Sequence, residues 1–366
     1  MGVGIIGASP ERGWAAVAHV PALAALPQYE LRAISTSRPE TAAAAREAFK
    51  VPLAFSDYRE LVAHPEVELV TVSVNVTRHY EVATAAIAAG KHIYCEWPLG
   101  RNLAEAEEIT RLAGEKGVRT VIGLQGRFAP AVVYLRDLVA DGYVGKILGT
   151  SIRGCGPDDV WTGRLDPHFE FHADKENGAT LLTIAVGHAL EQLCYALGEF
   201  ATVSSTLIAR RGEAFRVRDN ATVPMTAQDQ VAIGGTLEGG GLASVYYHGG
   251  PSPHPDFTWE INGTEGSLLL SAQDGYANIA ELSLQGARGA DPLALLTIPD
   301  RYHCAPAGLV GPAVNVASLY SRFAQDIKDG TAFAPDFDAA VRRHRLIAAI
   351  ERADATGTRQ TYDADA

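Results

Sequence analysis

Short apolar runs alternate with amphipathic stretches through the first third of the chain. The runs have the length of buried strands: Val3–Ile6, Glu30–Ser35, Leu69–Val74, His92–Cys95 and Val118–Leu124. The stretches between them have apolar residues at helical spacing: Trp14–Leu26, Pro39–Phe49, Asp57–Val62, His79–Ala89 and Asn102–Lys116. Buried strands that each lead into a helix are typical of a parallel sheet. We therefore predict a Rossmann doubly wound domain over residues 1–125.

The pattern changes beyond about Gly145. Alternating apolar and polar positions predict strands over Ile147–Arg153, Thr202–Arg210, Gln230–Glu238, Leu242–His248, Thr258–Asn262 and Gly266–Ser271, several of them separated by glycine-rich turns. Helical spacing returns at Gly178–Leu197, Ser318–Lys328 and Asp338–Asp354. Residues 126–366 are thus predicted to form an α+β domain on a mostly antiparallel sheet.

Composition narrows the possible classes of protein. A chain of 366 residues suits two domains, and its net charge of −12 disfavours direct binding to nucleic acid, which requires a basic face. The cysteines are scattered without zinc-site spacing, so we expect no metal. The first strand starts at once and no apolar run reaches membrane-spanning length. The expected location is therefore the cytoplasm, without membrane contact.

The carboxyl ends of the predicted parallel strands are the expected ligand site, because ligands of open α/β sheets bind there. Gly7 ends the first strand, and the turn through Ser9 leads to a helix at Trp14 in an imperfect G-x-G-x-x-G pattern. The second strand ends in Ser35-Thr36-Ser37-Arg38 without the carboxylate that usually binds the ribose of NAD. These hydroxyls and the arginine favour NADP, although NAD stays open.

The stretch Glu66–Leu99 carries a family resemblance. Its pattern strand-x-N-x-x-H…A-G-K-H-x-x-C-E-x-P-L resembles the Gfo/Idh/MocA family of NAD(P)-dependent sugar and cyclitol oxidoreductases. Further similar fragments are GVRTVIGLQGR, NGTEGSLLL and RRHRLIAAIERA. The family has a catalytic lysine between Glu96 and Pro98, whereas this chain has Trp97. With a tryptophan at this position, the chain resembles the branch of the family that contains the yeast galactose-regulon repressor. That repressor binds dinucleotide but acts as a transcriptional inhibitor.

Strand-end position and this resemblance together give the expected cofactor-binding residues. They are Gly7, Ser9, Trp14, Thr36, Ser37, Arg38, Val74, Asn75, His79, Glu96, Trp97 and Gln125, for NAD or NADP. The resemblance also implies a second domain that binds a carbohydrate or glycoside. Its sheet would serve as the interface of a homodimer or homotetramer.

The catalytic groups depart from the family pattern. Dehydrogenases of the family have an aspartate four residues before a histidine on one helix, and this chain keeps His188 but has Ile184. The indole of Trp97 does not titrate near neutral pH and cannot replace a lysine. We therefore expect His188 to be catalytic, assisted by a pocket residue such as Tyr247.

Polar and aromatic residues gather in the segment Gly154–Asn177, which we expect near the substrate. Trp161 has a flat face for a sugar ring, and Arg153 and Arg164 suit an anionic substituent. The expected substrate-binding residues are Trp97, Arg127, Arg153, Trp161, Arg164, His172 and His188.

Three functions remain open from the sequence. The protein is an oxidoreductase that transfers hydride at a sugar carbon, or a redox-neutral NAD-dependent glycoside hydrolase. In the latter, oxidation, elimination, water addition and re-reduction give net hydrolysis. The third hypothesis is a non-catalytic sensor of dinucleotide and sugar.

Overall fold

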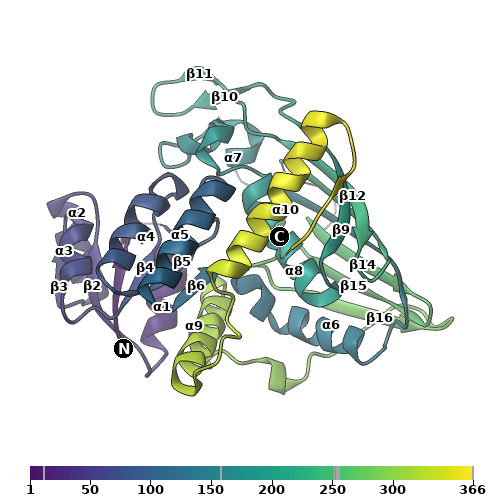
Figure 1. Ribbon diagram of the computed structural model, residues 1–366, viewed down its shortest axis with the longest axis horizontal. Coiled ribbons are helices and arrows are strands. Elements are labelled where there is room, and N and C mark those ends of the chain that lie inside the picture. The colour runs from purple at the N-terminus through teal and green to yellow at the C-terminus, as the bar shows by residue number, and fades with distance from the viewer. Residues whose placement is uncertain (11–12, 157–158, 251, 253–255, 365–366) are drawn as a thin grey trace. The chain divides into compact units, whose positions relative to one another are not determined.

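The computed structural model describes residues 1–10, 13–156, 159–250, 252 and 256–364, and it divides into two compact units (Figure 1). The first unit comprises Met1–Gln125 with Cys304–Val341, and the second Gly126–His303 with Arg342–Ala366. The expected division into 1–125 and 126–366 differs in one respect. A late segment belongs to the first unit rather than to the second.

Six strands in the described part of the first unit form one parallel sheet. They are β1 (Gly2–Ile6), β2 (Glu30–Ser35), β3 (Leu53–Phe55), β4 (Leu69–Val72), β5 (His92–Glu96) and β6 (Thr120–Gly123). Their order is β3-β2-β1-β4-β5-β6, so the direction of winding reverses between β1 and β4. This is the Rossmann strand order, which confirms the predicted fold of this unit.

Helices cover this sheet near their predicted positions. They are α2 (Pro39–Phe49), α3 (Tyr58–Ala63), α4 (His79–Ala88), α5 (Leu103–Lys116) and the late helix α9 (Pro312–Asp329). Asn102 caps α5 by accepting a hydrogen bond from the Glu105 amide at 3.0 Å, as expected. The helix predicted over Trp14–Leu26 is instead a π-helical turn, η1 (Ala15–His19), followed by α1 (Val20–Ala24). Pro21 lacks the N–H needed to continue one regular helix through this point.

The second unit is built on a large mixed sheet. Among the described residues its strand order is β17-β16-β15-β14-β7-β13-β12-β9-β18, and every pair is antiparallel except β7 with β13. The strands are β7 (Ile147–Gly156), β9 (Phe200–Ile208), β12 (Gln230–Leu237), β13 (Leu242–Gly249), β14 (Phe257–Gly263), β15 (Gly266–Ala272), β16 (Ser283–Arg288), β17 (Ala294–Leu295) and β18 (Gln360–Thr361). This confirms the predicted α+β architecture. A smaller sheet joins β8 (Arg164–Leu165), β10 (Glu213–Arg216) and β11 (Ala221–Pro224).

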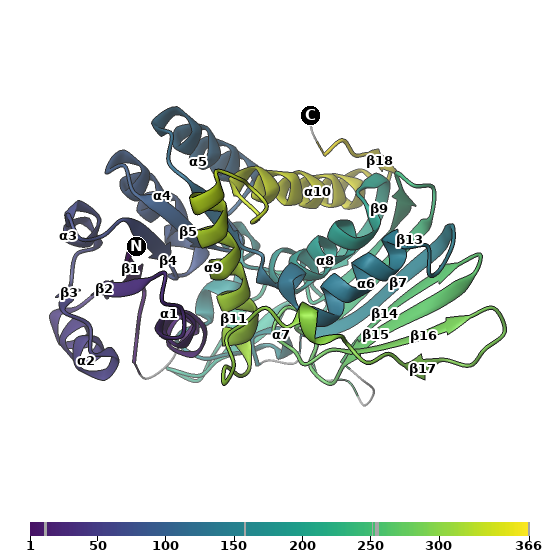
Figure 2. The ribbon, with the colours of Figure 1, turned by 90° about the horizontal axis from the view of Figure 1, so that it is seen from below.

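Helices of the second unit pack on one face of the large sheet (Figure 2). They are α6 (Pro130–Ala140), α8 (Gly187–Leu197) and the later part of α10 (Phe337–Thr356), and α7 (Asp159–Thr162) is a single turn beside β13. The opposite face exposes Leu242 and Tyr246. The predicted oligomer interface on this face stays a prediction.

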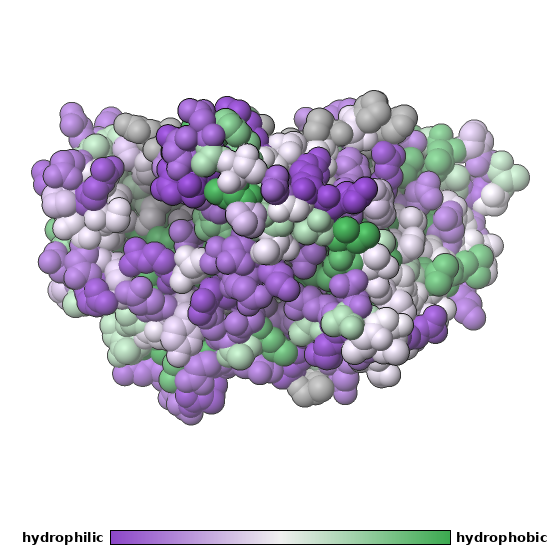
Figure 3. Space-filling view, turned by 90° about the horizontal axis from the view of Figure 1, so that it is seen from above, coloured by the Kyte–Doolittle hydropathy of each residue, from purple (hydrophilic) through white to green (hydrophobic). Residues whose placement is uncertain are grey.

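One stretch of helical turns contradicts the expectation that no apolar run is long enough to span a membrane. Lys175–Leu197 passes the length and composition criteria, but 78% of its most apolar window is buried in the protein. Burial of this kind is characteristic of a core helix, which explains why the stretch is apolar throughout. The face drawn in Figure 3 is mainly hydrophilic, with apolar side chains in small separate groups.

Candidate functional site

The predicted cofactor-binding residues lie along one edge of the Rossmann sheet. Gly7, Ser9 and Trp14 follow β1, and Thr36, Ser37 and Arg38 follow β2. Val74, Asn75 and His79 follow β4, Glu96 and Trp97 end β5, and Gln125 follows β6. Because the strands are parallel, all of these residues meet at the carboxyl edge of the sheet, where the strand order reverses.

The turn after β1 requires glycine. Gly7 has a φ of +102°, and a Cβ atom there would lie 2.4 Å from the carbonyl oxygen of Ser73, just beyond β4. The Gly7 amide also donates to the carbonyl of Ser35 at 2.9 Å, which ties the ends of β1 and β2 together. The backbone is therefore closely packed where β1, β2 and β4 end.

Several polar atoms of this edge are buried without a hydrogen-bond partner. They include the indole Nε1 of Trp14, the hydroxyl of Ser73 and the amide oxygen of Gln125. Buried polar atoms are nearly always paired in folded proteins. The edge thus retains donors and acceptors for a polar ligand, and this fits the predicted dinucleotide.

His79 holds two loops of the edge in place. Its ring nitrogens lie 2.7 Å from the carbonyl oxygen of Pro98 and 2.9 Å from that of Val74. Burial lowers the pKa of His79, so the ring is neutral and donates to one carbonyl at a time. The ring therefore connects the loop after β4 to the turn that contains Trp97, itself only 6% exposed and joined to Pro98 by a cis peptide bond.

The loop after β2 presents a cation. Ser37 and Arg38 are exposed, whereas the hydroxyl of Thr36 bonds to the carbonyl of Arg38 and to the hydroxyl of Thr41. No carboxylate among the described residues pairs with Arg38. The loop offers the positive charge and hydroxyl that a 2′-phosphate would require.

His188 lies on α8 in the second unit and is 7% exposed. Its Nδ1 atom is buried without a hydrogen-bond partner, and burial lowers the pKa of His188 to about 3. The ring is consequently neutral at ordinary pH and is a weak base. Ile184, one helical turn earlier, is half-buried and provides no charge to raise this pKa.

Tyr247 and Arg153, both predicted at the substrate site, lie on opposite faces of the large sheet. Tyr247 pairs with Gly154, and a Cβ atom on Gly154 would meet the Tyr247 ring at 2.2 Å, so these two share the helix-covered face. Arg153 shares the other face with Tyr246. The Tyr247 hydroxyl is buried without a partner, and burial raises its pKa, so it stays protonated. It can donate a hydrogen bond but cannot act as a base.

Trp161 and His172 come together in a buried aromatic cluster. The Trp161 indole donates to the hydroxyl of Tyr276 at 2.5 Å, and its ring meets His172 edge-on with centroids 5.2 Å apart. His172 bonds through Nδ1 to the carbonyl of Ala179 at 2.7 Å. Trp161 is 1% exposed, so its face packs in the core instead of forming an open platform, whereas Arg164 is exposed.

The second unit also contains a buried ion cluster that no sequence motif predicts. The predicted substrate residue Arg127 pairs with Glu191 of α8, and the other Glu191 oxygen lies 3.0 Å from Nε of Arg343. Arg343 also pairs with Glu199 and donates to the sulfur of Cys194 at 2.8 Å. These charges come from positions far apart in the sequence, and no local motif marks them.

Comparison with known proteins identifies the family. Residues 1–124 match the model of an oxidoreductase family with an NAD-binding Rossmann fold, and residues 130–272 match the C-terminal domain of Gal80p. The galactose/lactose metabolism regulatory protein GAL80 of Saccharomyces cerevisiae is 30% identical over 320 residues, which cover 80% of this chain and 72% of that protein. The chain belongs to the Gfo/Idh/MocA family, in its Gal80-like branch.

Other relatives of the protein include dehydrogenases. Dehydrogenase aclE of Aspergillus oryzae is 40% identical over 184 residues, a match that spans about half of each chain (48% of each). The solved structure of a levoglucosan dehydrogenase in complex with NADH and L-sorbose has a TM-score of 0.88 at 23% identity, with 100% of both chains covered, and thus shares the fold. The Gfo/Idh/MocA assignment makes the cofactor a nicotinamide dinucleotide, NAD or NADP.

The buried His188 predicts an acid-sensitive stability in this Gfo/Idh/MocA protein. Its folded pKa of about 3 lies below the ordinary value of 6.5, so between these values the unfolded chain binds more protons and stability falls as the pH falls. Replacing His188 by asparagine is expected to reduce the fall in the free energy of unfolding below pH 6.5 by roughly 1.4 kcal/mol per pH unit. Urea unfolding at pH 7 and pH 5 measures it, with the exposed His303→Ala as control. An unchanged pH slope in His188→Asn would contradict the prediction.

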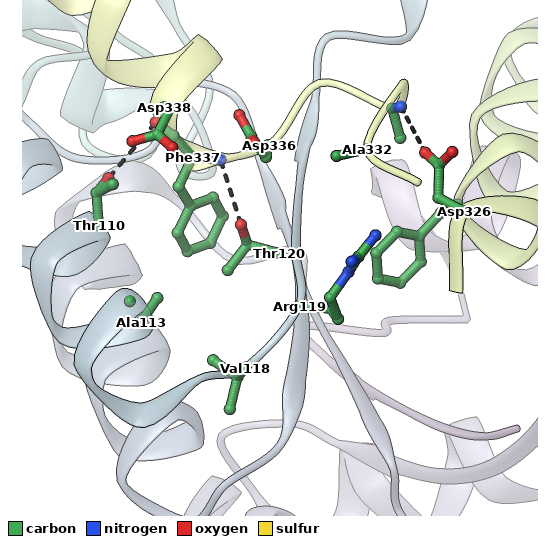
Figure 4. A pocket seen from close by; sticks show the side chains of 13 residues that line it. Thr110, Ala113, Val118, Arg119, Thr120, Asp326, Ala332, Asp336, Phe337 and Asp338 are labelled. Carbon is green, nitrogen blue, oxygen red and sulfur yellow. Dashed lines mark hydrogen bonds between the residues drawn. The ribbon is translucent and has the colours of Figure 1, made fainter. Parts of the chain in front are cut away.

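A separate cavity of about 280 Å³ lies at the amino end of β6, the opposite end of that strand from Gln125 (Figure 4). It is lined from α5, β6, α9, the loop that follows α9 and the start of α10. Its main polar groups are already paired. Asp326 accepts from the amides of Phe333 and Ala334 at 2.9 and 2.7 Å, and Arg119 donates to the carbonyl of Thr331. In the described residues, moreover, no cluster of His, Cys, Asp or Glu could hold a metal. We assign no chemistry to this cavity.

Proposed function

We propose that the protein is an NAD(P)-dependent oxidoreductase that acts on a carbohydrate or glycoside. Family membership supports this class, since the relatives of the protein include dehydrogenases such as aclE and levoglucosan dehydrogenase. The observation that carries the proposal is the unpaired, buried Nδ1 of His188. A buried polar atom without a partner marks a place where a ligand can supply one, and a sugar hydroxyl suits an imidazole.

The chain's own residues would have limited tasks. A bound nicotinamide would supply the acceptor for a hydride from the sugar carbon, and the hydroxyl proton would leave to solvent. The carboxyl edge around Gly7, Trp14 and Gln125 would hold the dinucleotide. His188 would bind and orient the reacting hydroxyl, because its low pKa prevents it from retaining the proton. Tyr247 would donate a hydrogen bond to substrate oxygen.

The first experiment measures two signals together. The protein is incubated with NAD or NADP and a panel of sugars and aryl glycosides, while NAD(P)H absorbance and aglycone release are recorded. NAD(P)H formation without aglycone release supports the proposal. Cofactor-dependent release without NAD(P)H would instead identify a redox-neutral glycoside hydrolase. Silence in both signals, with cofactor binding demonstrated by calorimetry, would reject both enzymes.

A non-catalytic sensor is the second candidate, and particular residues favour it. Trp97 and Ile184 occupy the positions of the family's lysine and aspartate, and the remaining His188 is a weak base. The relative GAL80 is a regulatory protein. A sensor would bind the dinucleotide without turnover and would bind a partner protein only when the dinucleotide is present. A pull-down with and without cofactor tests this second requirement.

Cofactor preference gives a further prediction. If Arg38 binds the 2′-phosphate, Arg38→Ala should weaken NADP binding about tenfold, because a charge-assisted contact is lost, and leave NAD binding unchanged. Isothermal titration with both cofactors measures the ratio. Arg59→Ala is the matched control, since Arg59 is an exposed arginine of α3 in the same unit that pairs with Glu81. Equal loss for both cofactors would show that Arg38 does not discriminate between them.

A further inference from the structure

A buried polar chain leads from the carboxyl edge of the Rossmann sheet into its core. Glu96 at the end of β5 has its Oε1 atom 2.9 Å from Nε2 of His19, a fully buried residue of η1. The His19 Nδ1 atom lies 3.0 Å from the hydroxyl of Tyr320, and that hydroxyl lies 2.8 Å from the hydroxyl of Thr71 in β4. The proposed function assigns no role to His19, Thr71 or Tyr320.

Along this series of polar contacts, from Thr71 to Glu96, each group can donate a hydrogen bond to the next. A carboxylate only accepts, so Nε2 of His19 is the nitrogen that bears hydrogen toward Glu96. Nδ1 then faces the Tyr320 hydroxyl and accepts from it, and the Tyr320 oxygen accepts in turn from Thr71. The hydrogen-bond partner of one ring nitrogen thereby determines whether the other ring nitrogen bears a hydrogen. Tyr320 sets the tautomer with which His19 holds Glu96.

Packing leaves little freedom for the carboxylate. A Cβ atom on Gly123 of β6 would lie 2.6 Å from Oε2 of Glu96, so the carboxylate fills the space of the missing side chain. The ring of Tyr320 stacks on Tyr94 with centroids 4.7 Å apart, and Tyr94 meets His19 at 5.0 Å. Glu96 is therefore held from two neighbouring elements, with its side chain 13% exposed at the edge.

In the described part of the protein, the groups around this carboxylate other than His19 carry no fixed positive charge. Burial raises the pKa values of Tyr94, Cys95 and Tyr320, so these groups stay protonated and neutral. His79, whose pKa burial lowers, is neutral as well. No lysine or arginine among the described residues forms an ion pair with Glu96. A partly buried carboxylate without a lysine or arginine partner favours a cationic ligand.

We propose that Glu96 makes this site prefer the oxidised nicotinamide cofactor over the reduced one, and that His19, Thr71 and Tyr320 are the positioning residues that hold its carboxylate. The oxidised nicotinamide ring is a cation and the reduced ring is neutral, so a carboxylate beside the ring would attract only the oxidised form. The inference rests on the proposed binding of a nicotinamide dinucleotide, and it applies to an enzyme and to a sensor alike.

The test is the ratio of dissociation constants for the reduced and the oxidised cofactor. Calorimetry measures both constants for the unaltered protein and for Glu96→Gln, which keeps the shape of the side chain and removes its charge. The substitution is expected to weaken oxidised-cofactor binding by at least about fivefold relative to reduced-cofactor binding. A purely structural disturbance would weaken both forms together and leave the ratio unchanged.

Two tyrosine variants test the positioning residues. Tyr320→Phe removes the hydroxyl that fixes His19 and should shift the ratio in the same direction, by less. Tyr29→Phe is the matched control, because Tyr29 packs on the same ring but donates to the main-chain carbonyl of Tyr320 at 2.8 Å, outside the chain to Glu96. If Glu96→Gln does not fold, the ratio of dissociation constants is compared between Tyr320→Phe and Tyr29→Phe. A shift in Tyr320→Phe alone supports the inference, and equal ratios overturn it.

The possible failures are distinguishable. If the unaltered protein binds both redox forms and neither Glu96→Gln nor Tyr320→Phe changes the ratio, the inference on Glu96 is overturned while the proposed function stands. If the unaltered protein binds neither form, the proposed function fails and the inference fails with it.

Discussion

Replacing Glu191 by alanine is expected to lower the free energy of unfolding by about 3–5 kcal/mol, because it leaves buried arginines without their shared carboxylate. Arg343 is 3% exposed and Arg127 is 15% exposed, so water cannot replace the lost partner. Glu199 continues to pair with Arg343, which places the loss within this range instead of above it. Urea unfolding followed by circular dichroism measures the change.

The matched control removes a carboxylate from an exposed ion pair. Glu115 pairs with Arg111 on the solvent side of α5, and Glu115→Ala should leave the unfolding midpoint unchanged. A small effect of Glu191→Ala, comparable to that of Glu115→Ala, would mean that the cluster around Arg343 reorganises at little cost. In that case, the buried charges would not hold α8 in place.

Replacing Gly7 by alanine is expected to weaken dinucleotide binding about 10- to 100-fold. The new Cβ atom would lie 2.4 Å from the carbonyl oxygen of Ser73, and the φ of +102° is strained for any residue with a side chain. The turn must therefore move away from the end of β4, where the cofactor is predicted to bind. Calorimetric titration with NAD and NADP measures the loss.

Gly114→Ala is the control for this substitution. Gly114 lies inside α5, and a Cβ atom there meets nothing within 4 Å. Alanine at that position should preserve binding and leave stability unchanged or raise it by up to about 1 kcal/mol. Normal dinucleotide affinity in Gly7→Ala would show that the turn after β1 does not contribute to the cofactor site.

Local signals in the sequence predicted the elements well, whereas long-range partners were not predictable. The ends of α5 follow from Asn102 and Gly117, which act within one helical turn. His19 and Tyr320, in contrast, are separated by 301 residues, and neither belongs to a motif. The same holds for Glu191 and Arg343. A hydrophobic pattern indicates that a position is buried but does not identify the side chain that it meets.

Burial of single side chains was also hard to predict from composition. Trp161 lies in a stretch rich in polar residues and was expected to present its ring to a sugar. Gly156 leaves room for its ring and Gly249 for its main chain, because a Cβ atom would lie 2.2 Å from a ring carbon of Trp161 at Gly156 and 2.2 Å from its carbonyl oxygen at Gly249. Space left by glycines on neighbouring strands is a property of the folded sheet and has no local signature.

The position of α9 affects how the protein is made. Tyr320 on this helix completes the core beside Thr71 and Tyr94, yet the ribosome adds it nearly 200 residues after Gln125, as their numbering shows. While the strands of the large sheet are being synthesised, the N-terminal strands therefore lack α9, and the apolar surface that this helix covers is exposed. A gene fragment that stops at Gln125 would encode an incomplete nucleotide-binding unit, and fusion of residues 304–341 to that fragment would supply the missing helix.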